Sequence, residues 1–154
     1  MKEFEEFVNK NNDNVTKSKS KDVNGLVFAF VGDAVFSLFV RGWLASESTC
    51  KAGVLHGRAT KFVRASFQSE LLELLWDRLT SEEQKVAINA RNQKTNNVAK
   101  NSNLSEYKKS TSFEAVLGYL YLTKQTERLY DLLAKCKIEM KKVLTEQQNT
   151  KGKK

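Results

Sequence analysis

The chain has 154 residues and a formal net charge of +8, with 26 Lys and Arg residues against 18 Asp and Glu. It has no proline, only seven glycines, one histidine and two distant cysteines, which argues against turn-rich β architecture, a disulfide framework and a zinc site. One domain is expected from this length. The positive charge favours nucleic acid or an anionic membrane surface as a partner. Alternatively, the Lys and Arg side chains only keep the surface solvated.

The N-terminal segment, residues 1–22, is predicted to be a flexible leader. Phe4 and Phe7 could belong to one helical turn, but a polar stretch rich in Lys, Asn and Ser follows them. The segment lacks the basic and apolar pattern of a signal peptide. A folded domain is predicted over residues 23–145, and residues 146–154 are predicted to form a basic disordered tail.

Residues 25–44 are the most hydrophobic part of the chain. A helix that is apolar on almost every face is expected to lie at the centre of a domain. Residues 23–40 are also about as long as a membrane span, but Asp33 lies within them. Placing this acid in lipid would cost roughly 2.5–3.5 kcal/mol, so a buried core helix is preferred to a membrane helix.

The rest of the chain has apolar residues at spacings of three and four, which is typical of amphipathic helices. A break in the first of these helices is expected near Gly57, and a capping box formed by Thr80 and Glu83 starts the second. Residues 91–109 hold many Asn and Lys residues and are predicted to be a loop or a mobile insertion. The sequence therefore predicts an all-α domain, with these helices over residues 51–78, 80–92, 112–123 and 125–144.

Asp33 needs a compensating interaction if it lies in a core helix. An ionised carboxylate is costly to bury among apolar side chains unless something stabilises its charge. Three solutions are open: a protonated carboxyl group, a salt bridge to Arg41 or another cation, or a bound metal ion.

Glu114 also has two interpretations. Thr111-Ser-Phe-Glu114 is a capping-box pattern, in which Glu114 would only bind the start of its own helix. However, both Asp33 and Glu114 lie on apolar helices beside small residues, among them Gly32 and Gly118. Two such helices can pack closely and bring the carboxylates together, where Mg²⁺ would bind with several of its waters. Such a pocket in a basic protein is suited to hydrolysis of phosphodiesters.

Two motifs make the sequence similar to the ribonuclease III family. Residues 30–36, Phe-Val-Gly-Asp-Ala-Val-Phe, resemble the family signature, and residues 112–121 resemble its second motif, in the same order and at a fitting spacing. Residues 55–68 and the segment Arg91-Asn-Gln-Lys94 resemble Mini-ribonuclease III, the short bacterial form without a double-stranded-RNA-binding domain. The resemblance covers roughly residues 23–135.

The resemblance implies the helical fold of the ribonuclease III catalytic domain and a Mg²⁺-dependent endoribonuclease, with Mn²⁺ as a substitute. Such an enzyme cleaves double-stranded RNA, leaves 5′-phosphate and 3′-hydroxyl ends, and would use Asp33 and Glu114 as catalytic and metal-binding residues. The resemblance further implies a homodimer acting on precursor 23S (large-subunit) ribosomal RNA, and it leaves room for a ribosomal protein that presents the substrate. Cys50 and Cys136 are expected to be free thiols, so the protein is expected to be cytoplasmic. Full-length members carry two further carboxylates where this chain has Ala29 and Thr111, so we expect weak rather than tight metal binding.

Cations are expected to hold the RNA duplex, because no separate RNA-binding domain is expected. A-form RNA is recognised through its shape, phosphates and 2′-hydroxyls, which favours contacts from Lys and Arg. Each candidate can equally be an ordinary solvated charge. The candidates are Arg91, Asn92, Lys94, Lys100, Lys108 and Lys109 in the basic insertion, with His56, Arg58, Lys61 and Arg64 on the preceding helix as weaker choices.

Two other functions compete with the nuclease. The first is a non-catalytic RNA- or ribosome-binding module on the same fold, in which the missing carboxylates mark lost activity. The second is a basic helical DNA-binding protein, which lacks support from a helix-turn-helix pattern and leaves Asp33 unexplained. The nuclease is the preferred interpretation.

Overall fold

Helices account for nearly all of the chain that the structure, a computed structural model, describes: residues 2–11, 22–47, 49–94 and 103–152. No strand occurs among these residues, and the predicted all-α class is confirmed. The α-helices are α1 (Lys2–Asn11), α2 (Gly25–Glu47), α3 (Ala52–Val63), α4 (Ala65–Leu75), α5 (Ser81–Asn92), α6 (Leu104–Leu122) and α7 (Thr126–Lys151), with a short 3-10 helix, η2 (Trp76–Arg78), after α4.

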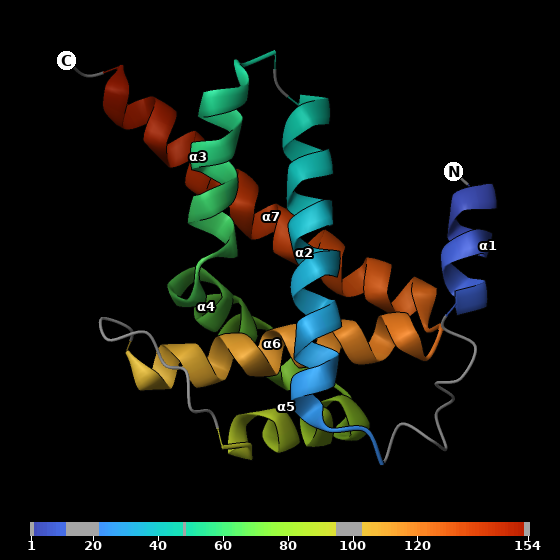
Figure 1. Ribbon diagram of the computed structural model, residues 1–154. Coiled ribbons are helices and arrows are strands. Elements are labelled where there is room, and N and C mark those ends of the chain that lie inside the picture. Colours follow the sequence, from blue (N-terminus) through green and yellow to red (C-terminus); the bar gives the residue numbers. More distant parts are fainter. Residues whose placement is uncertain (1, 12–21, 48, 95–102, 153–154) are drawn as a thin grey trace.

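Helix α6 lies at the centre of the fold. From Ser110 to Leu122 every residue except Glu114 and Tyr121 is buried. Helices α2, α4, α5 and α7 all pack against it, and Figure 1 shows α2 crossing it. A helix enclosed in this way offers a rigid support for any side chain that it presents to a pocket.

The backbones of α2 and α6 touch where they cross. A Cβ atom added to Gly32 would lie 1.7 Å from the carbonyl oxygen of Glu114, and one added to Gly118 would lie 1.9 Å from the carbonyl oxygen of Phe28. Only hydrogen fits at these two positions, so the close approach predicted from the small residues is confirmed. This contact brings the segment containing Asp33 directly against the one containing Glu114.

Helix α2 is only half enclosed, which corrects the prediction that it is the central helix. Its inner face, which includes Phe36 and Val40, is buried, whereas Val27, Phe30 and Leu38 are 50%, 81% and 70% exposed. By length and apolar composition α2 is the one described helix that could cross a membrane, yet its inner face belongs to the protein core. Hydrophobicity alone did not distinguish the enclosed face from the uncovered one.

The break in the predicted helix over 51–78 lies at Arg64 and not at Gly57. Gly57 continues α3, whereas the backbone of Arg64 is extended, with φ −69° and ψ 154°. The side-chain Nε2 of Gln68 donates a hydrogen bond to the carbonyl oxygen of Val63 at 3.0 Å. The last residue of α3 is therefore capped by a side chain of the next helix, and the glycine at position 57 does not interrupt α3.

Helix α6 begins earlier than predicted, and the loop predicted over 91–109 is correspondingly shorter. The Asn103 side chain accepts a hydrogen bond from the N–H of Ser105 at 2.9 Å and caps the helix. Lys108 and Lys109 therefore stand on a helix and not in a loop. Residues 95–102 lie outside the described part of the chain.

The two ends of the described chain are also more helical than predicted. Helix α1 occupies residues 2–11 of the predicted leader, and α7 continues to Lys151 through most of the predicted tail. The polar composition of both segments suits solvated helices as well as disorder, because these helices need only one apolar stripe for packing.

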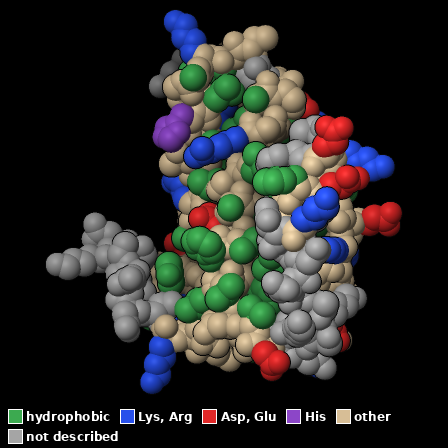
Figure 2. Space-filling model, turned by 45° about the vertical axis from the view of Figure 1, so that its right-hand side comes forward, with side chains coloured by type: hydrophobic (Ala, Val, Ile, Leu, Met, Phe, Trp, Pro, Cys, Tyr) green, Lys and Arg blue, Asp and Glu red, His purple; other side chains and the backbone are tan. Residues whose placement is uncertain are grey.

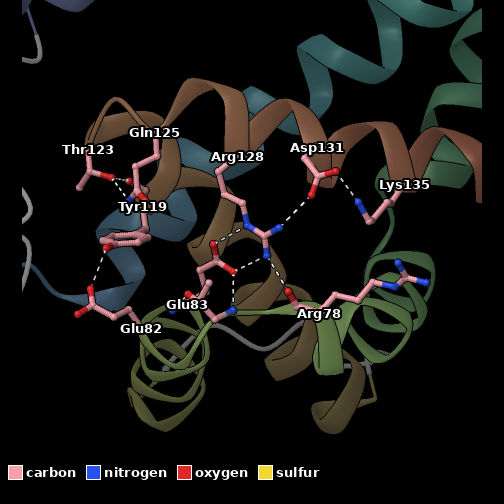
Figure 3. Close-up of polar contacts among 10 residues, drawn as sticks. Arg78, Glu82, Glu83, Tyr119, Thr123, Gln125, Arg128, Asp131 and Lys135 are labelled. Atoms are coloured by element: carbon pink, nitrogen blue, oxygen red, sulfur yellow. Dashed lines mark hydrogen bonds and ion pairs between the residues drawn. The ribbon is translucent and has the colours of Figure 1, made fainter.

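An ion pair joins α7 to the start of α5. The guanidinium of Arg128 contacts both carboxylate oxygens of Glu83, at 2.9 and 3.0 Å, and the carbonyl oxygen of Arg78 at 2.7 Å (Figure 3). Burial would raise the pKa of Glu83, but hydrogen bonds from Arg128 and Thr80 outweigh it and hold this pKa below its usual value. The capping box predicted at Thr80 and Glu83 is confirmed, and the same carboxylate also anchors α7.

We predict that Gly32→Ala destabilises the protein by more than about 3 kcal/mol, because the new methyl group meets backbone that cannot rotate away. Gly42 lies on the same helix with open space around it, so Gly42→Ala should instead stabilise by about 1 kcal/mol through helix propensity. Chemical denaturation of the two variants measures both effects. Equal stabilities would contradict the close contact of α2 with α6.

Candidate active site

Asp33 and Glu114 line one pocket of about 610 Å³. Asp33 comes from α2 and Glu114 from α6, and Gln68 on α4 lines the pocket from a third helix. The two acids are 81 residues apart in sequence, since 114 − 33 = 81, and the crossing at Gly32 brings them to the same place.

Asp33 is exposed, which corrects the expectation that it is buried in a core helix. It projects from the side of α2 that the fold leaves uncovered and stands at the open side of the pocket. Among the described residues it makes no ion pair, and Arg41 on the same helix is also exposed and does not pair with it. The charge of Asp33 is therefore stabilised by solvent and is available to a ligand.

Glu114 is the more enclosed of the two acids. The interpretation that it only caps its helix is wrong, because α6 begins at Leu104 and Thr111 lies well inside it. The hydroxyl of Thr111 instead donates to the carbonyl oxygen of Tyr107 at 3.0 Å. Burial, and then the negative charge of Asp33, raise the pKa of Glu114 to about 8, against a smaller lowering by the Gln68 side chain. This repulsion means that a cation between the two carboxylates would stabilise both.

Among the described residues, two carboxylates and not four line the pocket. Ala29 and Thr111, which stand where full-length ribonuclease III enzymes carry acids, both line it and both are buried. Within the described ranges no group of three or more His, Cys, Asp and Glu side chains is gathered. Two carboxylates with room for water suit Mg²⁺, which commonly keeps most of its water shell.

Lys94 is the RNA-binding candidate that lines the carboxylate pocket. Arg91 and Lys109 line a second pocket of about 310 Å³, beside Trp76, where Lys109 forms an ion pair with Glu73. Asn92 ends α5 between these two places and is exposed. Lys94, just after α5, therefore lies near the carboxylates, whereas Arg91 lines the second pocket and Lys109 is already partnered.

The remaining candidates lie elsewhere on the described surface. His56 and Lys61 are on α3, and Arg64 is the exposed residue between α3 and α4, directly before Ala65 of the pocket lining. Lys108 is partly exposed on the first half of α6. Lys100 lies outside the described residues.

Gln68 and Tyr107 line the pocket and were not predicted as site residues. Tyr107 lies in a segment predicted to be a loop, so its position could not be anticipated. Gln68 left no clear signal, because it stands among Ser66, Ser69 and Glu70 and the sequence alone does not show that it is buried. Buried amides of this kind need a hydrogen-bonding partner, which can point to a site.

Comparisons with known proteins agree with this arrangement. A family model described as the ribonuclease III domain matches residues 26–125, which include both acids. A Mini-ribonuclease 3 of Enterococcus faecalis is 41% identical over 118 residues, covering 75% of this chain and 89% of the relative. A Mini-ribonuclease 3 of Clostridium tetani is 40% identical over 120 residues, covering 77% and 79%.

A solved structure is also similar. The crystal structure of a Fusobacterium nucleatum protein superposes with a TM-score of 0.69 at 28% identity, covering 75% of this chain and 93% of that one. The domain match extends over more than half of the sequence, and this chain covers 89% and 79% of the two relatives. The resemblance seen in the sequence motifs is thereby confirmed, and the chain belongs to the Mini-ribonuclease 3 family, whose ribonuclease III domain it carries.

Proposed function

We propose that the pocket between α2, α4 and α6 is the active site of this endoribonuclease and that Asp33 and Glu114 hold its Mg²⁺. The family supplies the reaction, cleavage of double-stranded RNA by hydrolysis of phosphodiesters. The observation that supports the residue assignment is that the acids of the two family motifs line one pocket and repel each other's charge.

The residues of the pocket fit a divalent ion with hard oxygen ligands. Mg²⁺, or Mn²⁺ in its place, would be held by the two carboxylates and by water, and when bound it would activate water and stabilise the leaving oxygen. Glu114 must release its proton before it can act as a ligand. Lys94, on the lining of the same pocket, is placed to neutralise the charge of an RNA phosphate.

The substrate that we propose is duplex RNA in precursor 23S ribosomal RNA, processed in the cytoplasm. Duplex recognition by this domain would depend on surface cations near the pocket. Lys94 is the strongest candidate because it lines the carboxylate pocket, and Asn92 and Arg91 stand two and three residues before it. A ribosomal protein that presents the RNA would compensate for so small a binding surface.

We propose further that the protein is a homodimer formed through α2. Val27, Phe30, Ala34 and Leu38 follow spacings of three and four along the uncovered side of this helix, and all are exposed. Figure 2 shows hydrophobic side chains gathered along this face of the molecule. A contiguous apolar patch of this kind is typical of an interface. Two copies joined here would carry two sites, one for each RNA strand.

The competing function is a non-catalytic RNA-binding module, which the presence of only two acids in the pocket favours. We predict that Asp33→Asn lowers cleavage of a long RNA duplex in Mg²⁺ by at least about 1000-fold, because the metal site loses several kcal/mol of transition-state stabilisation. Asp33 is exposed, so the variant should fold and still bind duplex RNA in a gel-shift assay.

Asp77→Asn is the matched control for this experiment, since Asp77 is an exposed acid on η2 outside the carboxylate pocket. It should retain full cleavage. A wild-type protein that binds the duplex but never cuts it in Mg²⁺ or Mn²⁺ would establish the binding module instead.

We predict that the affinity for Mg²⁺ increases with pH up to about pH 8. Because the pKa of Glu114 is raised to about 8, its carboxyl group is mostly protonated at pH 6 and must lose that proton to bind the ion. Each pH unit below 8 should weaken binding by about tenfold, measurable by titration calorimetry. An affinity that is constant between pH 6 and 8 would show that Glu114 is not a ligand.

The same group has the opposite effect on stability when the metal is removed by EDTA. Its folded-state pKa lies above the ordinary value of 4.5, so its contribution to stability is complete below pH 4.5 and is lost as the pH rises through about 8. Glu114→Gln should remove this loss, and its melting temperature should depend less on pH than that of the wild type.

We predict a solution mass of twice the chain mass of 17.5 kDa in light scattering. Leu38→Lys should reduce it to the mass of one chain, because a charge would then be buried in the interface. Ile138→Lys, at a comparably exposed apolar residue on α7, should leave the dimer intact. A single-chain mass for the wild type would refute the proposed interface.

A further inference from the structure

A buried amide contributes to the carboxylate pocket from a helix that neither family motif includes. Gln68 on α4 is 0% exposed, yet its side chain lines the pocket together with Asp33 and Glu114. Its neighbours along α4, Phe67, Leu71 and Leu72, are all buried core residues. A polar side chain in such a position is costly unless it is hydrogen-bonded, so its role has to be sought among its contacts.

One end of the Gln68 amide is fixed to the backbone. Its Nε2 donates to the carbonyl oxygen of Val63 at 3.0 Å, across the break between α3 and α4. Because a carbonyl oxygen can only accept, the nitrogen and not the oxygen of the amide must face Val63, and this sets the orientation of the whole group.

The oxygen of the Gln68 amide has no hydrogen-bond partner among the described residues. This oxygen, Oε1, is buried. A methionine would fill similar space without leaving an acceptor unpaired. The presence of an amide despite this cost indicates that Gln68 does something that an apolar side chain cannot do.

The group that the Gln68 amide can act on in this pocket is the carboxyl group of Glu114. Gln68 on α4 and Glu114 on α6 line the same pocket, and of the two acids described in that lining Glu114 is the less exposed, so the buried amide and the half-buried carboxyl group border one cavity. An amide N–H that faces a carboxylate stabilises its charge and also fixes its direction. The ionised state is the one that a metal ligand requires.

We propose that Gln68 is a positioning residue, which holds the Glu114 carboxyl group in the orientation that binds the metal ion, with the Val63 carbonyl as its anchor. The inference rests on the proposed function, since it concerns the same pocket. It adds a third helix, α4, to the two that carry the acids. Partners of this kind around metal ligands typically change metal affinity by 10- to 100-fold when they are replaced.

The test compares Gln68→Met with Ser112→Ala. Both variants remove a buried hydrogen bond from a side chain to a backbone carbonyl, since the Ser112 hydroxyl donates to Ala87 at 2.7 Å outside the carboxylate pocket. Gln68→Met should weaken Mg²⁺ binding in calorimetry without RNA by at least about tenfold, and lower kcat at fixed Mg²⁺ with an unchanged KM for duplex RNA. Ser112→Ala should lose thermal stability but bind Mg²⁺ like the wild type.

Gln68→Asn provides a second variant should the methionine variant fail to fold. It keeps a buried amide that is one methylene too short to contact both Val63 and Glu114, so the same loss of metal affinity is expected. Wild-type affinity and kcat in whichever of the two Gln68 variants folds would overturn the inference and leave the proposed function intact. A wild-type protein that neither binds Mg²⁺ nor cleaves RNA would overturn the proposed function itself.

Discussion

The contact between the backbones of α2 and α6 determines the geometry of the site. Gly32 touches the carbonyl of Glu114, and Gly32 directly precedes Asp33. The two acids are thus placed by a main-chain contact and not by the reach of flexible side chains. Because α6 is enclosed along most of its length, Glu114 has little freedom to move, whereas Asp33 stands on the uncovered side of α2. The pocket combines one fixed carboxylate with one accessible carboxylate.

Holding the two carboxyl groups in one pocket makes it unfavourable for both to be ionised, and this favours a cation between them. Burial and Asp33 both oppose the ionisation of Glu114, so in the absence of a cation one of the two carboxyl groups retains a proton near neutral pH. A divalent ion reverses the balance, because it stabilises both negative charges at once. In the metal site that we propose, only two acids would attract the ion, so the orientation of each carboxylate would matter more than in a site with four.

Local sequence patterns predicted the structure correctly only where the surrounding structure agreed with them. The capping box at Thr80 is correct because a helix does begin there, but the same pattern at Thr111 lies inside a helix whose cap is Asn103. Gly57 is tolerated within α3, and the break at Arg64 depends on a side chain of the next helix. The meeting of α2 with α6 was predictable because glycine on both helices permits close packing.

The exposure of α2 could not be derived from its composition. Apolar residues have the same appearance in a sequence whether they face a core or a surface that another molecule covers. For the same reason Asp33 was expected to be buried, when it stands beside the uncovered stripe. The burial of Gln68 was also hidden, because it stands among Ser66, Ser69 and Glu70, which are typical of an exposed helix face.

Phe30 belongs both to the exposed stripe of α2 and to the lining of the carboxylate pocket. Any molecule that covers the stripe must therefore also form part of the rim beside Asp33. Binding of a second chain to the stripe and binding of a ligand in the pocket are then coupled. A bound ligand changes the free energy of self-association by the same amount as self-association changes the free energy of ligand binding. The specific activity of such a protein would vary with its own concentration, even though each chain carries both acids.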